Sequence, residues 1–419
     1  MVDKNLFLYD LGVVAIMKDE DPYVKEWLEY HLLAGVDHFY IYDNDSTPEF
    51  KKILQSYIDA GIVTYTFLPG LTKQYEAYND SFQRFKFECR YIAWIDADEF
   101  ILPKSKPTIT EVADEILSLI PNAAALGVNW LMFGANGHEK ADYSRGVLDR
   151  FTACDEEINR HIKTIINPRK IYYFQNPHFA FYFPGCYSVN EEKTAFLGPF
   201  NDSKTADKIR INHYYTKSRE EYEKKVQRGR SDINLKRNMD SFTILNHNET
   251  FDNDIIKYRD ARIAALIPDG NIAKLFPAKQ INYQRLFNAL NKNLMPTLTK
   301  GTPQEFFADK METFLTCFNL IAAIKDKVFD ETTAKFFEEL SLKAIHRALL
   351  SPLQAADIFL LINEMPKILE LDYPAVKNIR DVLLNLISQL MTTLRAQARW
   401  QEFTELEYKF KLLKIFPKS

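Results

Sequence analysis

The chain has 419 residues, a length that usually holds more than one hydrophobic core, so two domains are expected. Hydrophobic residues make up 46% of the sequence and charged residues 26%, which is the composition of a folded globular protein and not of a disordered one. The formal net charge of −4 gives no overall basic surface, so no nucleic-acid partner is expected. The four cysteines form no Cys-x-x-Cys pair, which argues against structural zinc and against a disulfide framework.

The amino-terminal stretch is apolar but interrupted by Asp10, and it has neither a basic leader nor a small-residue cleavage site. No segment approaches the roughly 20 apolar residues of a membrane span. We therefore expect a cytoplasmic protein, with the inner face of the membrane as a candidate location.

The first part of the chain alternates strands with helices. Apolar residues recur at three- and four-residue spacing from Tyr23 onward, and Gly35 ends the expected helix. This alternation predicts a parallel α/β sheet whose ligands bind at the carboxyl ends of the strands. The expected strands are 11–17, 38–42, 62–68 and 91–95, and the expected helices between them are 23–35, 48–60 and 74–88.

The most informative stretch is YIAWIDADEFILP, residues 91–103, in which a buried strand ends in Asp96, Asp98 and Glu99. Two aspartates one residue apart at a strand end offer hard carboxylate oxygens to Mg²⁺ or Mn²⁺, and such an ion can hold a diphosphate. An acidic turn after a buried strand is the alternative. No Gly-x-Gly-x-x-Gly and no Walker motif occurs, so dinucleotide redox chemistry and P-loop phosphoryl transfer lose their main support.

Four blocks of sequence together carry a family resemblance. They read VVAIMKDEDPYVKEWLEYHLLAGVDHFYIYDNDS, YIAWIDADEFILP, NWLMFGANGH and INHYYTKSREEYEKKVQRG, in this order. The stretch from about residue 11 to 232 resembles the family 92-like glycosyltransferases, which are related to family 2 and have the GT-A fold. The resemblance implies transfer of a sugar from a nucleoside-diphosphate sugar to an acceptor hydroxyl, with a divalent cation bound to the diphosphate.

The resemblance also assigns candidate metal ligands. Asp96 and Asp98 match the Asp-x-Asp motif, with Asp98 as the direct ligand and Asp96 as a partner of the ribose or of a metal-bound water. His213 occupies the place of a third ligand, and neutral imidazole suits Mn²⁺ beside carboxylates. Glu99 is expected to be structural, because side chains alternate along an extended strand.

The expected nucleotide contacts come from several parts of the chain. Glu20 and Asp43 follow the first two strands and are expected to line the nucleoside pocket; a helix N-terminal acid and a turn acid are the alternatives. Asn79 and Arg84 lie on the helix whose start borders the nucleotide in the resembled family, and an exposed polar face is the alternative for Arg84. Contacts with phosphate are expected from Lys163, which lies in a segment rich in β-forming residues, and from Lys217 and Arg228. A solvated helix face is the alternative for the block that carries Lys217 and Arg228.

An inverting transferase needs a base that takes the proton of the acceptor hydroxyl. His138, at the tip of a glycine-containing loop, is the leading candidate for this catalytic role or for acceptor contact. A solvent-exposed or hydrogen-bonded loop histidine is the alternative. The carboxylate rivals are Glu139, Asp155 and Glu156.

Beyond about residue 251 the strand signals stop and helical spacing takes over, with helices expected over 254–267, 305–329, 333–350, 355–365 and 375–400. We expect a GT-A-like domain over 1–250 and an all-α domain over 251–419. The helical domain is a candidate for acceptor binding, homo-oligomerisation or peripheral membrane contact. The last suggestion rests on aromatic residues mixed with Lys409, Lys411, Lys414 and Lys418, and helix packing explains the same spacing.

The resulting hypothesis is a metal-dependent, inverting glycosyltransferase that uses Mn²⁺ or Mg²⁺ and a UDP-sugar donor. The expected acceptor is a glycan or lipid-linked glycan, in the synthesis of bacterial surface glycans. The alternatives are a metal-dependent nucleotidyl or phosphoryl transferase and a non-catalytic nucleotide-binding scaffold. Release of pyrophosphate, release of a nucleoside diphosphate, or binding without turnover distinguishes the three.

Overall fold

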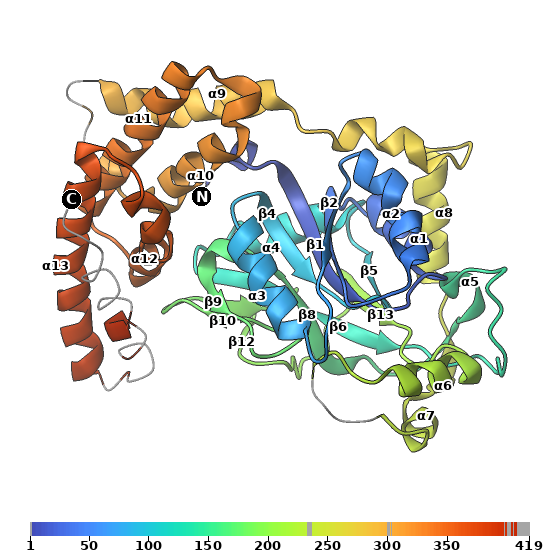
Figure 1. Cartoon of the computed structure of the whole chain (residues 1–419). Helices are drawn as coiled ribbons and strands as arrows, with labels where there is room; N and C mark the ends of the chain where they lie inside the picture. The colour runs from blue at the N-terminus through green and yellow to red at the C-terminus, as the bar shows by residue number, and fades with distance from the viewer. Residues whose placement is uncertain are drawn as a thin grey trace. The chain divides into compact units, whose positions relative to one another are not determined.

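The structure is a computed structural model in which the chain separates into two compact units (Figure 1). The α/β unit contains residues 9–181 and 187–280, and the helical unit contains residues 1–8, 182–186 and 281–419. The structure describes residues 2–232, 237–299, 302, 304–397, 399, 404 and 406–408.

A ten-stranded mixed sheet forms the centre of the α/β unit, with the order β12-β11-β6-β8-β4-β1-β2-β3 along its main path. β1 pairs in parallel with β2 and with β4, and β2 pairs in parallel with β3. β8 runs antiparallel between β4 and β6. The strands on this path are β1 (Tyr9–Met17), β2 (His38–Asp43), β3 (Val63–Phe67), β4 (Cys89–Trp94), β6 (Ala123–Met132), β8 (Asn159–Ile166), β11 (Tyr187–Val189) and β12 (Ala195–Phe196).

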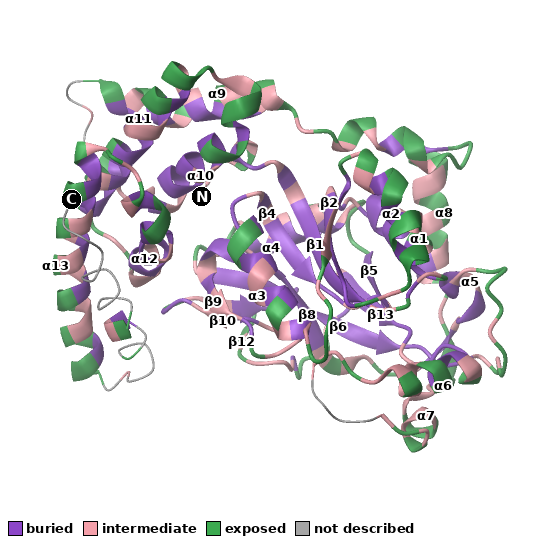
Figure 2. Ribbon diagram, viewed as in Figure 1, coloured by how far each residue is buried: buried purple, intermediate pink, exposed green. Residues whose placement is uncertain are grey.

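The central strands are apolar along most of their length because helices and loops cover both faces of the sheet. All ten residues of β6 are buried, and β1 has a single partly exposed residue, Asp10 (Figure 2). The parallel strands β1, β2 and β4 end on the same edge of the sheet, where their polar residues come together.

Two further strands, β5 (Glu99–Pro103) and β13 (Ile209–His213), complete the sheet. They are antiparallel to each other, with His213 opposite Glu99, and β13 also runs parallel to β6. This pairing joins segments more than a hundred residues apart, and it places the end of β13 beside the acidic residues that follow β4.

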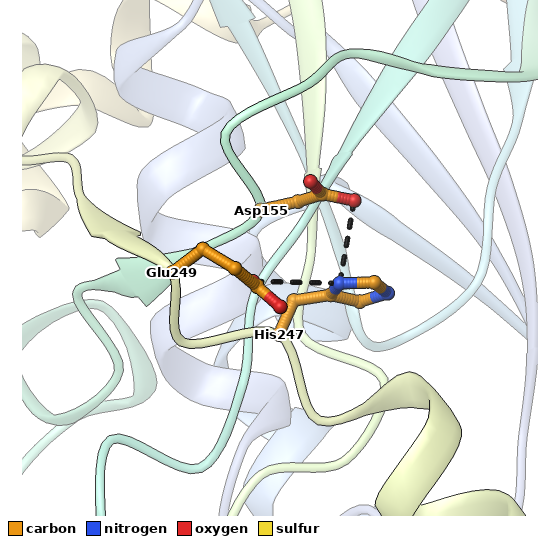
Figure 3. A group of neighbouring side chains, drawn as sticks. All are labelled: Asp155, His247 and Glu249. Atoms are coloured by element: carbon orange, nitrogen blue, oxygen red, sulfur yellow. Dashed lines mark ion pairs between the residues drawn. The ribbon is translucent and has the colours of Figure 1, made fainter.

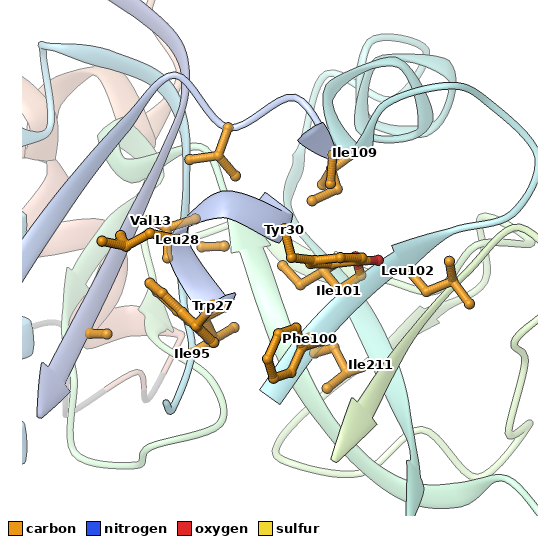
Figure 4. Packing of buried hydrophobic residues seen from close by; sticks show 14 of the residues in the cluster. Val13, Trp27, Leu28, Tyr30, Ile95, Phe100, Ile101, Leu102, Ile109 and Ile211 are labelled. Carbon is orange, nitrogen blue, oxygen red and sulfur yellow. The ribbon is translucent and has the colours of Figure 1, made fainter. Parts of the chain in front are cut away.

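The helix α1 (Val24–Leu33) packs its aromatic face on β5. The Trp27 indole donates a hydrogen bond to the Glu99 carbonyl at 2.9 Å, and the Tyr30 hydroxyl donates one to the Ile101 carbonyl at 3.0 Å. Phe100 lies beside Tyr30 in the same cluster (Figure 4). Burial of these large side chains fixes the backbone that carries the acidic residues.

The remaining elements of the α/β unit connect and cover the sheet. They are α2 (Pro48–Asp59), α3 (Gln74–Phe85), α4 (Ile109–Leu117), α5 (Val147–Arg150), β7 (Ala153–Cys154), β9 (Ile171–Tyr173), α6 (Arg219–Arg228), α7 (Asp240–Leu245), β14 (Thr250–Phe251) and α8 (Asp254–Leu266). The division between the units falls within β10 (Phe181–Tyr182), since Phe181 belongs to the α/β unit and Tyr182 to the helical unit.

The helical unit has its own apolar core, which includes Phe314, Ile345 and Leu361. α12 runs through Pro366, beyond the end expected at Met365, and it buries Ile368. The helices are α9 (Tyr283–Leu294), α10 (Met311–Val328), α11 (Glu331–Leu349), α12 (Ala355–Leu369) and α13 (Pro374–Ala396).

The expectation of an α/β region followed by an all-α region is confirmed. By their contacts, residues 251–280 group with the α/β unit, while the expected boundary at residue 250 stays a prediction. None of the described helices combines the length and the apolar character needed to cross a membrane. The lysines from Lys409 to Lys418 lie outside the described residues.

Candidate functional site

A cavity of about 210 Å³ opens at the carboxyl ends of β1 and β4. Its walls come from the ends of these strands, from the loop before α3, from β6 and β13, and from α6 with the segment after it. The lining residues with polar or aromatic side chains are Lys18, Glu20, Asn44, Thr72, Gln74, Asp96, Asp98, Trp130, His178, His213, Tyr215, Lys225, Arg228, Arg230, Ser231, Asp232 and Arg237.

Asp98 and His213 face each other in this cavity. The pairing of β5 with β13 brings them together, and Tyr214 donates its backbone N–H to the Asp98 carbonyl at 2.8 Å. Asp98 Oδ1 lies 3.5 Å from His213 Nε2, and Asp98 Oδ2 accepts a hydrogen bond from Lys225 Nζ at 2.5 Å. Burial alone would raise the pKa of the Asp98 carboxyl, but Lys225 and His213 hold this pKa well below its usual range. Asp98 is therefore a carboxylate at neutral pH.

Asp96 also borders the cavity, but its carboxylate turns toward other partners. Its Oδ1 accepts a hydrogen bond from Gln74 Nε2 at 2.9 Å, and its Oδ2 accepts one from Lys163 Nζ at 2.9 Å. Lys163 is buried and lies 3.7 Å from Glu99 Oε2 as well. Burial would lower the pKa of Lys163, but Asp96 and Glu99 hold it well above its usual range. The Lys163 ammonium thus offsets negative charge in the acidic segment that contains Asp96 and Glu99.

Glu20 joins the end of β1 to α6. Its Oε1 lies 2.6 Å from the Arg228 guanidinium, and its Oε2 lies 3.7 Å from Lys217 Nζ. Lys217 also rests over the Tyr23 ring, with 3.6 Å between the ammonium and the ring centre. Burial lowers the pKa of Lys217. Glu20 holds these cations in place next to the cavity.

The helix α6 presents Lys225 and Arg228 to the cavity from adjacent turns. Its start is fixed by a capping box, in which Ser218 and Glu221 bind each other's backbone N–H groups. Glu221 also receives two hydrogen bonds from the Arg150 guanidinium, both at 2.9 Å, in a buried bidentate pair. These contacts set the rotation of the helix and thereby the direction of its cations.

Five predicted nucleotide contacts lie outside the residues that line the cavity in the described part of the chain: Lys163 and Lys217, whose partners are given above, and Asp43, Asn79 and Arg84. Asp43 is buried, and its carboxylate accepts hydrogen bonds from Tyr65 at 2.5 Å and from the Ser46 N–H at 2.9 Å. Asn79 binds the backbone of Phe174 and Tyr75, and Arg84 pairs with Asp80 on an exposed face of α3. These partners correspond to the structural alternatives for Asp43 and Arg84, and the binding roles stay predictions.

His138 is half-buried, with its ring against Phe151, and it is not among the described residues that line the cavity. Its carboxylate rivals lie outside the lining too. Asp155 faces His247, with 3.3 Å between Asp155 Oδ2 and His247 Nδ1, and Glu249 Oε2 lies 3.5 Å from the same nitrogen (Figure 3). The structure therefore does not bring any of the expected bases to Asp98.

The donor atoms of Asp98 and His213 suit a divalent cation, because a carboxylate oxygen and an imidazole nitrogen face each other across 3.5 Å. Asp96 does not complete this pair. In the described part of the chain, the group with three ligand atoms mutually within 4.8 Å is that of Asp155, His247 and Glu249. Asp98 and His213 thus fit as two ligands, and the assignment of a metal to them stays a prediction.

Some lining residues had no assigned role at the sequence level. Asn44 follows β2 directly and donates hydrogen bonds to the carbonyls of Leu68 and Gly70, which orders the loop that closes one side of the cavity. Trp130 lies within an apolar strand, where it is indistinguishable from a core residue. Because all ten residues of β6 are buried, the alternation of side chains between the two faces of the strand gave no signal either.

Comparison with known proteins identifies the family. The sequence model of glycosyltransferase family 92 matches residues 14–260, which is more than half of the chain. The chain belongs to glycosyltransferase family 92. This confirms the resemblance, and the fold class is that of a GT-A-type α/β domain with an all-α region after it.

Curated relatives match over shorter stretches. A family 92 protein of Ricinus communis is 24% identical over 164 residues, which cover 39% of this chain and 29% of that protein. A family 92 protein of Oryza sativa subsp. japonica is 26% identical over 161 residues, which cover 38% and 27%. A galactan beta-1,4-galactosyltransferase of Arabidopsis thaliana is 29% identical over 103 residues, which cover 22% and 21%. The match spans less than a third of the length of each of these relatives.

Among solved structures, that of S. aureus TarS 1-349 in complex with UDP is similar at 12% sequence identity. The match covers 81% of this chain and 89% of that chain, with a TM-score of 0.28.

Proposed function

We propose that this family 92 member transfers a sugar from a nucleoside-diphosphate sugar, with a UDP-sugar as the preferred donor, to a hydroxyl of a glycan or lipid-linked glycan. The observation that carries the proposal is the Asp98 carboxylate, held between His213 and Lys225 in a cavity that Arg228 and Arg230 also line. Such a concentration of positive charge beside a carboxylate–imidazole pair suits a diphosphate leaving group.

The residues of the chain have distinct parts in this reaction. Lys225 and Arg228 bind phosphate oxygens and stabilise the negative charge that grows as the nucleoside diphosphate departs. Glu20 orients Arg228, and Lys163 with Gln74 orients Asp96. Asp98 and His213 would hold Mn²⁺ or Mg²⁺, which supplies Lewis-acid stabilisation of the same charge. Inversion at the anomeric carbon and a role in bacterial surface glycan synthesis are parts of the proposal.

Asp98→Asn tests the site. The amide removes the charge that attracts a divalent cation, so we expect UDP-sugar turnover in Mn²⁺ to fall by about a hundredfold or more. The measurement is nucleoside-diphosphate release from a panel of UDP-sugars, with circular dichroism to show that the fold is kept. Turnover at the wild-type level would refute the metal assignment.

His247→Gln is the matched control, because His247 belongs to the group with ligand-like geometry outside the cavity. This variant should keep both turnover and its dependence on Mn²⁺. Release of pyrophosphate by the wild type would instead indicate a nucleotidyl transferase, and nucleotide binding without turnover across an acceptor panel would indicate a scaffold.

A further inference from the structure

Three aromatic side chains form one wall of the cavity, which we call the ring wall: Trp130, His178 and His213. The ring centres of Trp130 and His213 lie 4.3 Å apart at 64°, and those of Trp130 and His178 lie 5.1 Å apart at 56°. His213 also faces Asp98. The contacts therefore run from Lys225 through Asp98 and His213 to Trp130 and His178, with the cations at one end and the rings at the other.

Buried ring nitrogens in this wall lack partners. Trp130 is 9% exposed and His213 is 4% exposed. Neither Trp130 Nε1 nor His213 Nδ1 has a hydrogen-bond partner among the described residues. A buried polar group without a partner is costly, so such groups in a cavity wall indicate a ligand or water that satisfies them.

His178 supplies the opposite hydrogen-bonding character. Its Nδ1 lies 2.9 Å from the Ile162 carbonyl, which can only accept, so this nitrogen carries the proton. Burial and nearby Lys163 lower the pKa of His178 to about 3, so the ring is neutral at physiological pH. Nε2 is therefore left as an acceptor.

We infer that the ring wall binds the pyranose ring of a sugar substrate, an inference that rests on the proposed function. A pyranose has an apolar C–H face, which packs on an aromatic ring, and a rim of hydroxyls that both donate and accept. The Trp130 indole, which stacks on His161 with 5.2 Å between the ring centres, offers the part of its ring that lines the cavity and a donor, and neutral His178 offers an acceptor. Lys225 contacts one side of Asp98, and the ring wall follows on the other side. When the cations hold the diphosphate, the sugar of the donor extends past Asp98 to the ring wall, where it meets the acceptor.

The sugar that contacts the wall can belong to the donor or to the acceptor, and two variants separate these sources. Trp130→Phe keeps an aromatic ring but removes the N–H, and His178→Ala removes the acceptor nitrogen. Each loses one hydrogen bond to a hydroxyl, so we expect about a three- to tenfold effect. If the donor sugar contacts the wall, the Kd for UDP-galactose, UDP-glucose or UDP-N-acetylglucosamine rises. If the acceptor does, the KM for the acceptor rises and the donor Kd stays the same.

Binding of UDP alone is the internal reference, measured by calorimetry on the full chain in Mn²⁺. We expect both variants to bind UDP as the wild type does and to keep its melting temperature within a few degrees. The inference is overturned if UDP affinity falls in step with UDP-sugar affinity, or if donor Kd and acceptor KM both stay unchanged. The inference is also overturned if the wild type binds UDP but binds no UDP-sugar more tightly than UDP and binds no free sugar. A wild type that binds no nucleotide defeats the proposed function itself.

Discussion

At the scale of single residues, the acidic segment after β4 carries three carboxylates, and those of Asp98 and Glu99 have different surroundings. Asp98 gains two cationic or polar partners at the cavity, while Glu99 is fully buried beneath it. Glu99 Oε2 accepts a hydrogen bond from the Asp96 N–H at 2.8 Å, and Glu99 Oε1 has no partner among the described residues. Glu99 therefore shapes the turn and stays out of the cavity, as the alternation of side chains predicts.

The environment of Glu99 gives a pH-dependent prediction. Burial raises the pKa of the Glu99 carboxyl well above its ordinary value, although Lys163 opposes the rise. Because the folded pKa is the higher one, the stability linked to this proton is present below the unfolded pKa and is lost as the pH rises toward the folded pKa. The amide that replaces the carboxyl in the Glu99→Gln variant cannot ionise, so the unfolding free energy of the variant should rise relative to that of the wild type as the pH rises above about 4.3, the ordinary pKa of a glutamate.

Urea unfolding of both proteins at several pH values measures this difference. Glu156→Gln serves as the control, since Glu156 is exposed, and its curve should stay parallel to that of the wild type. Parallel curves for Glu99→Gln as well would show that Lys163 keeps Glu99 ionised in the folded state.

At the scale of elements, the sequence predicted the strands and helices that depend on one continuous stretch of residues. The spacing of apolar residues identified the strands and helices as far as β4, because each of these elements is formed by one continuous segment of the chain. The partnership of Asp98 with His213 depends on the pairing of β5 with β13, which no local pattern reports. The same limit explains Asp43, whose hydrogen bond to Tyr65 arises only when β2 and β3 lie side by side.

The start of α6 gives a prediction that separates stability from binding. Ser218→Ala removes the capping hydroxyl, which should cost about 1 kcal/mol of stability. It should also weaken UDP binding, since Lys225 and Arg228 depend on the orientation of this helix. Thr108→Ala removes the equivalent capping box of α4, which lines no part of the cavity in the described structure.

We expect the two variants to lose similar stability in urea unfolding, and Ser218→Ala alone to raise the Kd for UDP, by about two- to fivefold. Equal UDP affinity in both variants would mean that Glu221 and Arg150 hold α6 without the cap. Their bidentate contact makes that the competing explanation.

At the scale of the whole molecule, the helical unit could be predicted as helical but not as a unit. Its described helices α9 to α13 have periodic apolar residues, whereas the grouping of residues 251–280 with the α/β unit follows from contacts and not from composition. α9 was not among the expected helices, although Leu286, Ala289, Leu290 and Leu294 share one buried face. The apolar spacing of this helix is present in the sequence, at the three- and four-residue intervals that predict a helix.

The two units carry separate cores, and the proposed site lies wholly in one of them, which leads to a calorimetric prediction. A ligand that binds only the folded state stabilises it, by about 2.7 kcal/mol at a hundred times its Kd. UDP with Mn²⁺ should therefore raise the melting temperature of the α/β unit. The helical unit should unfold in a second transition, and its melting temperature should not change. Differential scanning calorimetry of the full chain with and without UDP measures both. A single transition that moves as one would show that the helical region unfolds cooperatively with the site, and the expected division into two domains would then be wrong.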